Sequence, residues 1–505
     1  MQNPDRLEPG TPPLSPAEPA PPSARPSLAL WAGPVAALML LLVPAPGGLE
    51  PAGWRTAAVA TWMAIWWITE ALPIPVTALL PLVLFPVLGI LPMADAAAPY
   101  ANEVIFLFMG GFFLAAGMET SGLHRRVALT IIRKVGLGPE RLVLGFMVAT
   151  AFLSMWISNT ATAAMMLPIG VAVVELFRGD RPREGFSLGV ALMLGIAYGA
   201  SIGGVATLIG TPPNAIFAAS VVELLDGEIG FGRWLLLGVP ITAVMLPLAW
   251  LLLVKVLHPP GPLSGDAREV LEDELARLGR ASTAERRVGV VFVATALAWV
   301  FRAPKTLGGV TLPGLQDLAP AIRDSTIAMA ASLLLFMIPR GGAERGPLLT
   351  WERARGIPWG VLILFGGGLS LARAMEATGL SRWIGASVAG LEGVPTLVLF
   401  AVLALLFVFL TELTSNAATT TMAIPVLVGA AAAMGTAPLP LMIVATLSSS
   451  MAFMLPAATP PNAIVFGSDY LTIPQMARAG LVLNLVAVCV VTLAAWMLIP
   501  LVFPS

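Results

Sequence analysis

A short polar motif that occurs twice in a hydrophobic chain constrains the fold more than any other feature. Ser-Asn-Thr at 158–160 lies between two apolar arms, and Ser-Asn-Ala follows at 415–417, 257 positions later. The same spacing relates three further pairs of positions, which are Ser154 and Thr411, Pro168 and Pro425, and Glu119 and Glu376. Matches that keep one spacing indicate a structural unit that is used twice.

A second motif is also duplicated. Thr-Pro-Pro-Asn at 211–214 returns at 459–462, at a spacing of 248, and both copies interrupt apolar runs. In a hydrophobic chain, a twofold repeat with helix breakers at corresponding places is typical of transporters, whose binding site lies where the repeats meet.

The composition indicates an integral membrane protein. The 505 residues are 57% hydrophobic and 11% charged, whereas an ordinary soluble domain is about 25% charged. Apolar runs approach the roughly 20 residues that a helix needs to cross a bilayer, and the alternation of barrel strands is absent. We therefore expect a lipid bilayer as partner and no nucleic acid.

Few residues suit catalysis. The two histidines, His124 and His258, lie near the ends of predicted spans, so a histidine metal site or catalytic base is not expected. The single cysteine, Cys489, cannot form an internal disulfide. We find no nucleophile with a base and no metal cluster, and therefore predict that the chain is not an enzyme.

The apolar runs predict an all-α polytopic membrane protein with about eleven transmembrane helices and two re-entrant hairpins. Each hairpin segment is too short for two full crossings. The chain is predicted to begin with a disordered, Pro-rich cytoplasmic tail at 1–27. A first half at 28–257 contains a hairpin at about 142–177, and a second half at 288–505 contains a hairpin at about 396–431. A cytoplasmic linker at 258–287, with an amphipathic helix near 267–278, joins the two halves.

The repeats are predicted to have inverted topology. The first repeat begins at the fourth crossing and the second at the ninth. Because an odd number of crossings separates these two starts, the repeats enter the membrane from opposite sides. With a cytoplasmic amino terminus, 21 of the 28 lysines and arginines fall on cytoplasmic segments, as the positive-inside rule expects. The other seven are Arg55, Arg233, Arg302, Lys305, Arg323, Arg373 and Arg382.

The duplicated motifs predict four helix starts in the middle of the membrane. Ser and Asn are favoured N-caps, and proline is tolerated in the first helical turn. Helix starts expose N–H donors and carry partial positive charge, so four together form an anion site without Lys or Arg. Freed carbonyls with Ser, Thr and Asn oxygens suit a hard monovalent cation such as sodium.

Four acidic residues in apolar runs have two open interpretations. They are structural hydrogen-bonding groups, or they are proton carriers that couple transport, since ionisable groups at depth are costly and usually functional. The four are Glu70, Glu119, Glu376 and Glu412.

These residues resemble a known family. The two hairpin motifs, the two Thr-Pro-Pro-Asn breaks and the run Trp-Ile-Thr-Glu-Ala-Leu-Pro-Ile-Pro at 67–75 are similar to those of the divalent anion:sodium symporter family of di- and tricarboxylate, citrate and sulfate transporters. The resemblance covers about residues 30 to 501. It implies a homodimer of eleven-span protomers, each with a scaffold domain and a mobile transport domain that works as an elevator.

The resemblance also implies site residues. One sodium ion would bind at Ser154, Ser158, Asn159 and Gly210, and a second at Thr411, Thr414, Asn416 and Ala458. The substrate would meet Ser158, Asn159, Thr160, Thr211, Ser415, Asn416, Thr459 and Pro460.

One position departs from the family. Where the family commonly has Thr in the second triplet, this chain has Ala417, so one hydroxyl donor to the anion is missing. Either Thr419 or Thr420 compensates, or the anion differs.

We accordingly expect a secondary active transporter of the plasma membrane that imports C4/C5 dicarboxylates such as succinate, malate or 2-oxoglutarate by sodium symport. The alternatives are a sodium-independent dicarboxylate exchanger, a transporter of sulfate or citrate, and a sodium/proton or arsenite antiporter that depends on a buried acid. A channel is a further alternative, although hairpins entering from opposite sides favour alternating access.

Overall fold

The computed structural model describes residues 28–179, 181–261, 267–307, 310–342, 345–387 and 393–503. The tail at 1–27, for which we predicted disorder, lies outside the described residues. The named elements of the described residues are helices, except for one short antiparallel pair of strands, β1 (Lys305–Leu307) and β2 (Val310–Leu312).

Seven helical segments of the described residues are long and apolar enough to cross a membrane. Six further helices are apolar and shorter, and three of them, 212–225, 396–410 and 438–449, belong to the predicted hairpins and broken spans. The second arms of the predicted hairpins, 159–178 and 416–433, are longer than a half-crossing needs and are among the seven. The fold is therefore that of a multi-pass membrane protein. The seven are 93–121, 159–178, 187–204, 231–257, 359–377, 416–433 and 473–502.

The first elements pack on one another and also on helices of the second half of the chain. Helix α1 (Leu28–Leu42) packs against α2 (Pro51–Thr69), where Trp66 Nε1 donates to Leu30 O at 3.0 Å. Four prolines interrupt the apolar run at 71–91 and divide it into two short helices, α3 (Ile74–Thr77) and α4 (Leu80–Val87). Helix α5 (Met93–Ala97) and the 3₁₀ turn η1 (Ala98–Ala101) follow.

The first repeat begins at α6 (Glu103–Ser121), whose start is capped by Asn102. Gly122, with φ of 81°, ends this helix and starts α7 (Leu123–Val135), an amphipathic helix that we did not predict. Hairpin arms α8 (Pro139–Ser154) and α9 (Asn159–Arg178) follow.

A broken span and a continuous one complete the first half. The broken span consists of α10 (Ser187–Gly204) and α11 (Pro212–Leu225), and the continuous one of α12 (Phe231–Leu251) with the π-helical segment η2 (Leu252–Leu257). The linker forms α13 (Ala267–Leu278), a helix at the residues where the sequence predicts one.

The second half repeats this order. A pair of helices precedes its repeat, and a hairpin, a broken span and a long final helix follow. The elements are α14 (Thr283–Val300), α15 (Leu315–Leu318), α16 (Asp324–Met337), α17 (Trp351–Ala354), α18 (Trp359–Ala377), α19 (Leu380–Ala386), α20 (Thr396–Leu410), α21 (Asn416–Ala433), α22 (Pro438–Ser449), α23 (Pro460–Phe466) and α24 (Ile473–Val502).

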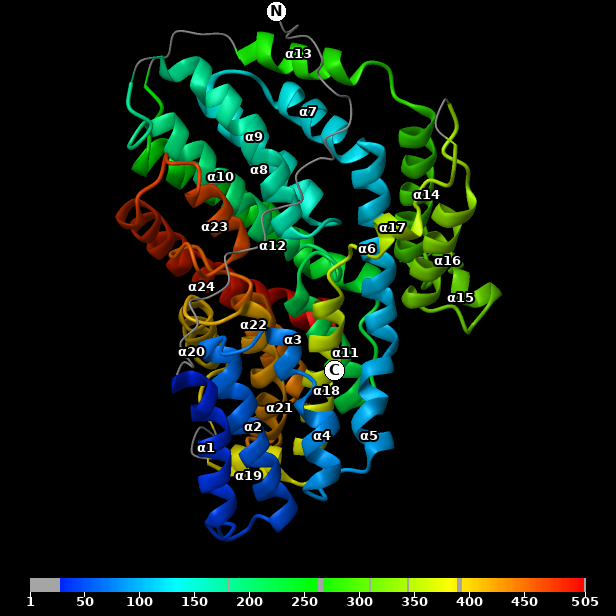
Figure 1. The fold of residues 1–505 in the computed structure, drawn as a ribbon, viewed down its shortest axis with the longest axis vertical. Coiled ribbons are helices and arrows are strands. Elements are labelled where there is room, and N and C mark those ends of the chain that lie inside the picture. The colour runs from blue at the N-terminus through cyan, green and yellow to red at the C-terminus, as the bar shows by residue number, and fades with distance from the viewer. Residues whose placement is uncertain are drawn as a thin grey trace, which may run out of the picture.

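The two halves interlock in the middle of the molecule. Helix α13 lies across the top, α1 and α2 lie at the bottom, and α14 and α16 stand at the right (Figure 1). Helix α9 packs on α23, and α11 packs on α21, so each hairpin lies against the broken span of the other half.

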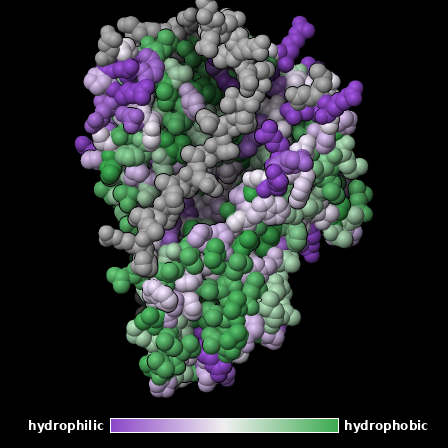
Figure 2. Space-filling model, viewed as in Figure 1, coloured by the Kyte–Doolittle hydropathy of each residue, from purple (hydrophilic) through white to green (hydrophobic). Residues whose placement is uncertain are grey.

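Close packing around α10 depends on glycine. A Cβ on Gly203 would lie 2.2 Å from Ala151 O, so only glycine lets α10 approach α8 this closely. Outside this core, hydrophobic side chains cover much of the lower surface, where α1 to α4 lie, and hydrophilic ones gather mainly toward the upper edge (Figure 2). An apolar outer surface is expected for helices that face lipid.

Candidate functional site

Four helices begin at the duplicated motifs. Helix α9 starts after Ser158, whose Oγ accepts a hydrogen bond from Ala161 N at 3.2 Å. Helix α23 starts after Thr459, whose Oγ1 accepts from Asn462 N at 3.3 Å. Helices α21 and α11 begin in the same way after Ser415 and Thr211, although neither side chain makes a capping bond. Unpaired first-turn N–H groups thus remain available at these tips.

The first hairpin tip gathers oxygen atoms around Asn159. Ser154 Oγ lies 2.6 Å from the Asn159 amide and 2.7 Å from Ala200 O. The same end of the amide lies 3.2 Å from Gly210 O and 3.3 Å from Ala200 O. Three of the four residues predicted for the first sodium ion, Ser154, Asn159 and Gly210, therefore meet here. Ser158 lies next to Asn159 as the cap of α9.

The second hairpin tip repeats this arrangement. Thr411 Oγ1 lies 2.6 Å from Asn416 Oδ1 and 2.9 Å from Ser449 O. Ser449 is the last residue of α22 and Ala200 lies close to the end of α10, and the carbonyl of each accepts from the hairpin hydroxyl of its own half. Both halves thus place one hydroxyl and one asparagine beside the carbonyl end of a broken helix.

This chemistry fits a cation. A hydroxyl has one proton, yet in each half it faces two acceptor oxygens, so acceptors outnumber donors. At Asn159 two arrangements would satisfy the excess acceptor oxygens. In one, the amide nitrogen faces the carbonyls of Gly210 and Ala200 and donates to them; in the other, the amide oxygen faces them and a cation lies between the oxygens. A hard cation such as sodium prefers oxygen ligands of this kind.

Other predicted sodium ligands are placed differently. Thr414 Oγ1 donates to Leu410 O at 2.9 Å and lies 2.5 Å from Thr419 Oγ1, so this hydroxyl is engaged within its own hairpin. Ala458 is buried directly before the cap of α23, and its N–H donates to Leu455 O at 3.2 Å.

The asparagine of each Thr-Pro-Pro-Asn motif donates hydrogen bonds to backbone carbonyls at the interruption of its broken span. Asn214 Nδ2 donates to Thr207 O at 2.8 Å and to Val205 O at 3.2 Å. Asn462 Nδ2 donates to Leu455 O at 3.0 Å. Both are fully buried, and they satisfy carbonyls that the interrupted helices leave free. We predicted no site role for them, although each belongs to a duplicated motif.

The substrate candidates differ in accessibility. Thr160 and Pro460, on α9 and α23, are exposed, and these two helices pack against each other. The remaining candidates are half-buried or buried: Ser158, Asn159, Ser415 and Asn416 are half-buried, and Thr211 and Thr459 are buried. The starts of α9 and α23 are therefore more accessible to an anion than the other candidates are.

Neither threonine that we considered as a substitute for the missing hydroxyl is free. Thr419 Oγ1 is paired with Thr414, and Thr420 Oγ1 donates to Asn416 O at 2.9 Å. Both side chains are buried, as is Ala417. The second triplet therefore has one donor fewer than the first.

Glu412, in the second hairpin, accepts hydrogen bonds from the segment between α22 and α23. Its carboxylate accepts from the backbone N–H groups of Phe453 at 2.6 Å, Met454 at 2.9 Å and Leu455 at 3.2 Å. A further bond comes from Asn484 Nδ2 at 2.8 Å. These contacts favour the structural interpretation of Glu412 over proton coupling. The other acids, Glu70, Glu119 and Glu376, are exposed at or near helix ends.

Two contacts join the halves near this site. Tyr198 Oη on α10 donates to Phe453 O at 3.1 Å, and the two rings meet edge to face with centroids 5.1 Å apart. Toward the end of α9, Glu175 accepts from Tyr470 Oη at 2.8 Å. Burial, together with this bond, raises the pKa of Tyr470 to about 12, so its hydroxyl stays protonated and donates.

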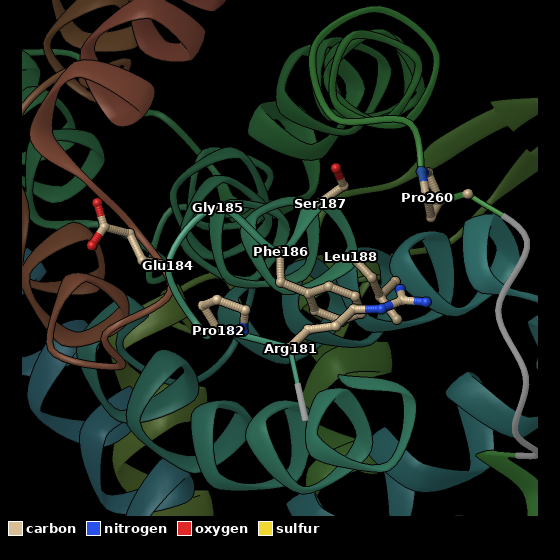
Figure 3. Close-up of a pocket in the computed structure, with 9 residues that line it drawn as sticks. Arg181, Pro182, Glu184, Gly185, Phe186, Ser187, Leu188 and Pro260 are labelled. Carbon is tan, nitrogen blue, oxygen red and sulfur yellow. The ribbon is translucent and has the colours of Figure 1, made fainter. Parts of the chain in front are cut away.

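A cavity of about 330 Å³ lies elsewhere, at the start of α10. Arg181 extends alongside Phe186 toward Pro260, whereas Glu184 points away (Figure 3). The guanidinium lies 5.7 Å from the centroid of the Phe186 ring. This cavity contains none of the helix tips, and we do not assign it to the site.

Comparison with known proteins agrees with this architecture. The model of the family described as the sodium:sulfate symporter transmembrane region matches residues 27–503. The chain belongs to the sodium:sulfate symporter family. Sodium-dependent dicarboxylate transporters named SdcS are relatives: that of Staphylococcus saprophyticus is 41% identical over 476 residues, covering 93% of this chain and 90% of the relative. That of Staphylococcus aureus is 40% identical over 488 residues, covering 95% and 92%.

Solved structures resemble this family member in fold. MtrF of Neisseria gonorrhoeae, described among antimetabolite efflux pumps, has a TM-score of 0.56 at 14% identity and covers 92% of this chain and 94% of its own. The YdaH transporter of Alcanivorax borkumensis has a TM-score of 0.53 at 16% identity, covering 81% and 87%. At such identities the likeness concerns the fold alone, which is that of membrane transporters.

Proposed function

We propose that this chain imports C4/C5 dicarboxylates, such as succinate, malate or 2-oxoglutarate, across the plasma membrane by sodium symport. The observation that carries the proposal is the duplicated cluster of hydroxyl, amide and carbonyl oxygens beside helix starts, around Asn159 and Asn416. The names of the staphylococcal relatives support both the sodium dependence and the class of substrate.

Sodium binds first in this mechanism. Each ion neutralises the surplus of acceptors beside Asn159 or Asn416 and fixes the hairpin tip against the broken helix. The asparagine side chains then have one orientation, and the first-turn N–H groups of α9 and α21 are held in place. Sodium binding therefore prepares the anion site, which is a form of preorganisation.

The dicarboxylate binds next. Helix starts at Ser158, Thr211, Ser415 and Thr459 supply backbone donors and partial positive charge. The substrate residues that we assign are Ser158, Asn159, Thr160, Thr211, Ser415, Asn416, Thr459 and Pro460. Because Ala417 has no hydroxyl to donate, the carboxylate at the second tip is held by fewer hydrogen bonds than the one at the first.

We propose an elevator movement between two groups of helices. Helices α8 to α12 with α20 to α24 would form the transport domain, since each hairpin packs on the broken span of the other half. Eleven crossings, a cytoplasmic amino terminus and a homodimer complete this proposal. Charge balance explains why the movement of the dicarboxylate is coupled to that of sodium. A doubly negative solute crosses the bilayer at a lower free-energy cost when the cations that neutralise it are bound with it.

Uptake of labelled succinate into proteoliposomes tests the function. We expect uptake with an inward sodium gradient and a loss of most of it when potassium replaces sodium. Uptake that needs preloaded unlabelled substrate and ignores sodium would instead identify a dicarboxylate exchanger. Competition by unlabelled sulfate or citrate distinguishes a carrier of those anions.

A further inference from the structure

A second polar cavity lies where α12 begins and α14 ends. Its volume is about 270 Å³, and it is lined by three basic residues, Arg233, Arg302 and Lys305, and by one acidic residue, Glu228. None of these residues belongs to the hairpin tips or breaks. The cavity is therefore separate in sequence from the transport site.

Arg302 is the buried centre of this region. Its Nε lies 2.7 Å from Asp324 Oδ1 and its Nη2 lies 2.6 Å from Glu228 Oε1, and only 7% of its side chain is exposed. Arg323 also pairs with Glu228. The third nitrogen, Arg302 Nη1, is buried and has no hydrogen-bond partner in the described part of the chain. A buried guanidinium N–H without an acceptor is costly, so an acceptor in the cavity would satisfy it.

The two remaining cations have no acidic partner in the described residues. The two nearby acids, Glu228 and Asp324, are already paired with Arg302 and Arg323, and no ion pair forms at Arg233 or Lys305 within the described ranges. Lys305 Nζ lies 3.4 Å from the point that a Cβ of Gly232 would occupy, so the ammonium group is next to the first turn of α12.

The start of α12 adds to the positive potential. This helix has 21 residues, so its first turn carries a substantial partial charge. Phe231 N already donates to Asp324 Oδ2 at 2.6 Å and Arg233 N to Gly230 O at 3.0 Å, and Lys305 lies beside Gly232 in the same turn. Two free side-chain cations, a buried guanidinium with one unsatisfied nitrogen and a helix start thus surround one cavity.

We propose that this cavity is a second anion site that takes a small dianion. The volume accommodates a four-carbon dicarboxylate or an inorganic dianion such as sulfate, and two unpaired cations match two negative charges. On the proposed topology the cavity faces the extracytoplasmic side, where it raises the local concentration of the substrate before the hairpin tips bind it. This recruiting role rests on the proposed function, whereas the binding itself does not.

The distribution of charge supports a functional origin. Seven basic residues are assigned to the outer face, and four of them, Arg233, Arg302, Lys305 and Arg323, gather at this cavity and its ion pairs. The positive-inside rule describes an excess of Lys and Arg on cytoplasmic segments, so such a concentration outside is unusual.

Local anion attraction can be measured by cysteine labelling of the full-length protein. Gln316 lines the cavity and is half-buried, so we choose Gln316→Cys in a Cys489→Ser background. The matched control is Ser387→Cys, which lines a cavity with the opposite charges Arg382 and Glu50. Rates are compared for anionic sulfonatoethyl and cationic trimethylammonium-ethyl methanethiosulfonates, in sodium-free buffer.

We expect the anionic-to-cationic rate ratio at Gln316→Cys to exceed the control ratio by about tenfold. Adding Arg233→Gln and Lys305→Gln should bring it to the control value. Succinate or sulfate, at equal ionic strength, should slow labelling at Gln316→Cys only. If only succinate slows the labelling, the cavity is a site for the substrate. If succinate and sulfate both slow it, the cavity is a general site for dianions.

A ratio equal to the control, or no protection by either dianion, overturns the proposal. Because the labelling needs neither sodium nor uptake, its failure is distinguishable from failure of the proposed function. Correct folding of each variant is checked by its elution in gel filtration and by labelling at Ser387→Cys in the same background.

Discussion

Asn484 on the last helix donates a hydrogen bond of 2.8 Å to the carboxylate of Glu412, which lies beside the second hairpin tip. Both side chains are buried, and the same carboxylate accepts three backbone N–H groups of the broken span. The corresponding position in the first half is Met155, so the two halves stabilise their breaks by different means. Glu412 therefore joins the second hairpin to the second break, and in the proposed mechanism it would position the second cation site without being one of its ligands.

Substituting Glu412 tests this positioning role. In Glu412→Gln one oxygen is replaced by an amide N–H₂ group, which cannot accept from the backbone donors that it faces. We expect the sodium concentration for half-maximal uptake to rise about tenfold, equal to about 1.4 kcal/mol. Met155→Leu, at the equivalent position, should leave it unchanged. Normal sodium dependence in the Glu412→Gln variant would show that the carboxylate is dispensable.

The two hairpin asparagines should be equally necessary. Asn159→Ala and Asn416→Ala each remove an amide beside two acceptor oxygens, at a cost of about 1–3 kcal/mol per unsatisfied group. We expect uptake of succinate to fall by about tenfold to a hundredfold in each variant. Asn102→Ala, which removes the cap of α6, is the matched control and should lower stability by about 1 kcal/mol while uptake persists. If only one hairpin asparagine mattered, the twofold site would be refuted.

Gly204 should tolerate no side chain. A Cβ at this position would lie 2.5 Å from Asn159 Oδ1 and 3.1 Å from Gly210 O, inside the oxygen cluster. We predict that Gly204→Ala abolishes sodium-dependent uptake. Gly289→Ala on α14, where the nearest atom is a Leu123 methyl at 3.6 Å, should be neutral or stabilise the helix by up to about 1 kcal/mol. Uptake by the Gly204→Ala variant at the normal sodium concentration would contradict the assignment.

Restoring the missing hydroxyl should strengthen substrate binding. Ala417→Thr adds a donor at the start of α21, and a hydrogen bond to a charged group contributes about 1.5–3 kcal/mol. We therefore expect the KM for succinate to fall by about tenfold or more. Ala417→Val has the same shape without the hydroxyl and should not lower KM. Equal KM values for the two variants would mean that no carboxylate approaches this position.

The sequence predicts repetitive and periodic features well. The paired motifs coincide with the breaks between α8 and α9 and between α20 and α21, and Ala267–Leu278 is helical where the amphipathic pattern indicates a helix. The length of the apolar run at 71–91 alone would indicate one span, whereas its prolines divide it into α3 and α4. Helix α7 is not predicted from the sequence, because its charges at 125–134 resemble those of a loop.

The composition of the site is less predictable. The carbonyls of Ala200 and Ser449 belong to residues whose side chains carry no signal for that contact. Thr414 lies at a plausible position in the motif, yet its hydroxyl is paired with Thr419 across the hairpin turn. Such partners depend on how separate helices pack, which a local motif does not encode.

The central claim is that two inverted halves bring Asn159 and Asn416 together around one anion and its sodium ions. An experimental structure determined with sodium and succinate tests it most directly. We predict density for a cation beside each asparagine and for succinate between the two hairpin tips. Succinate bound elsewhere, or the two tips far apart with no density between them, would contradict the account.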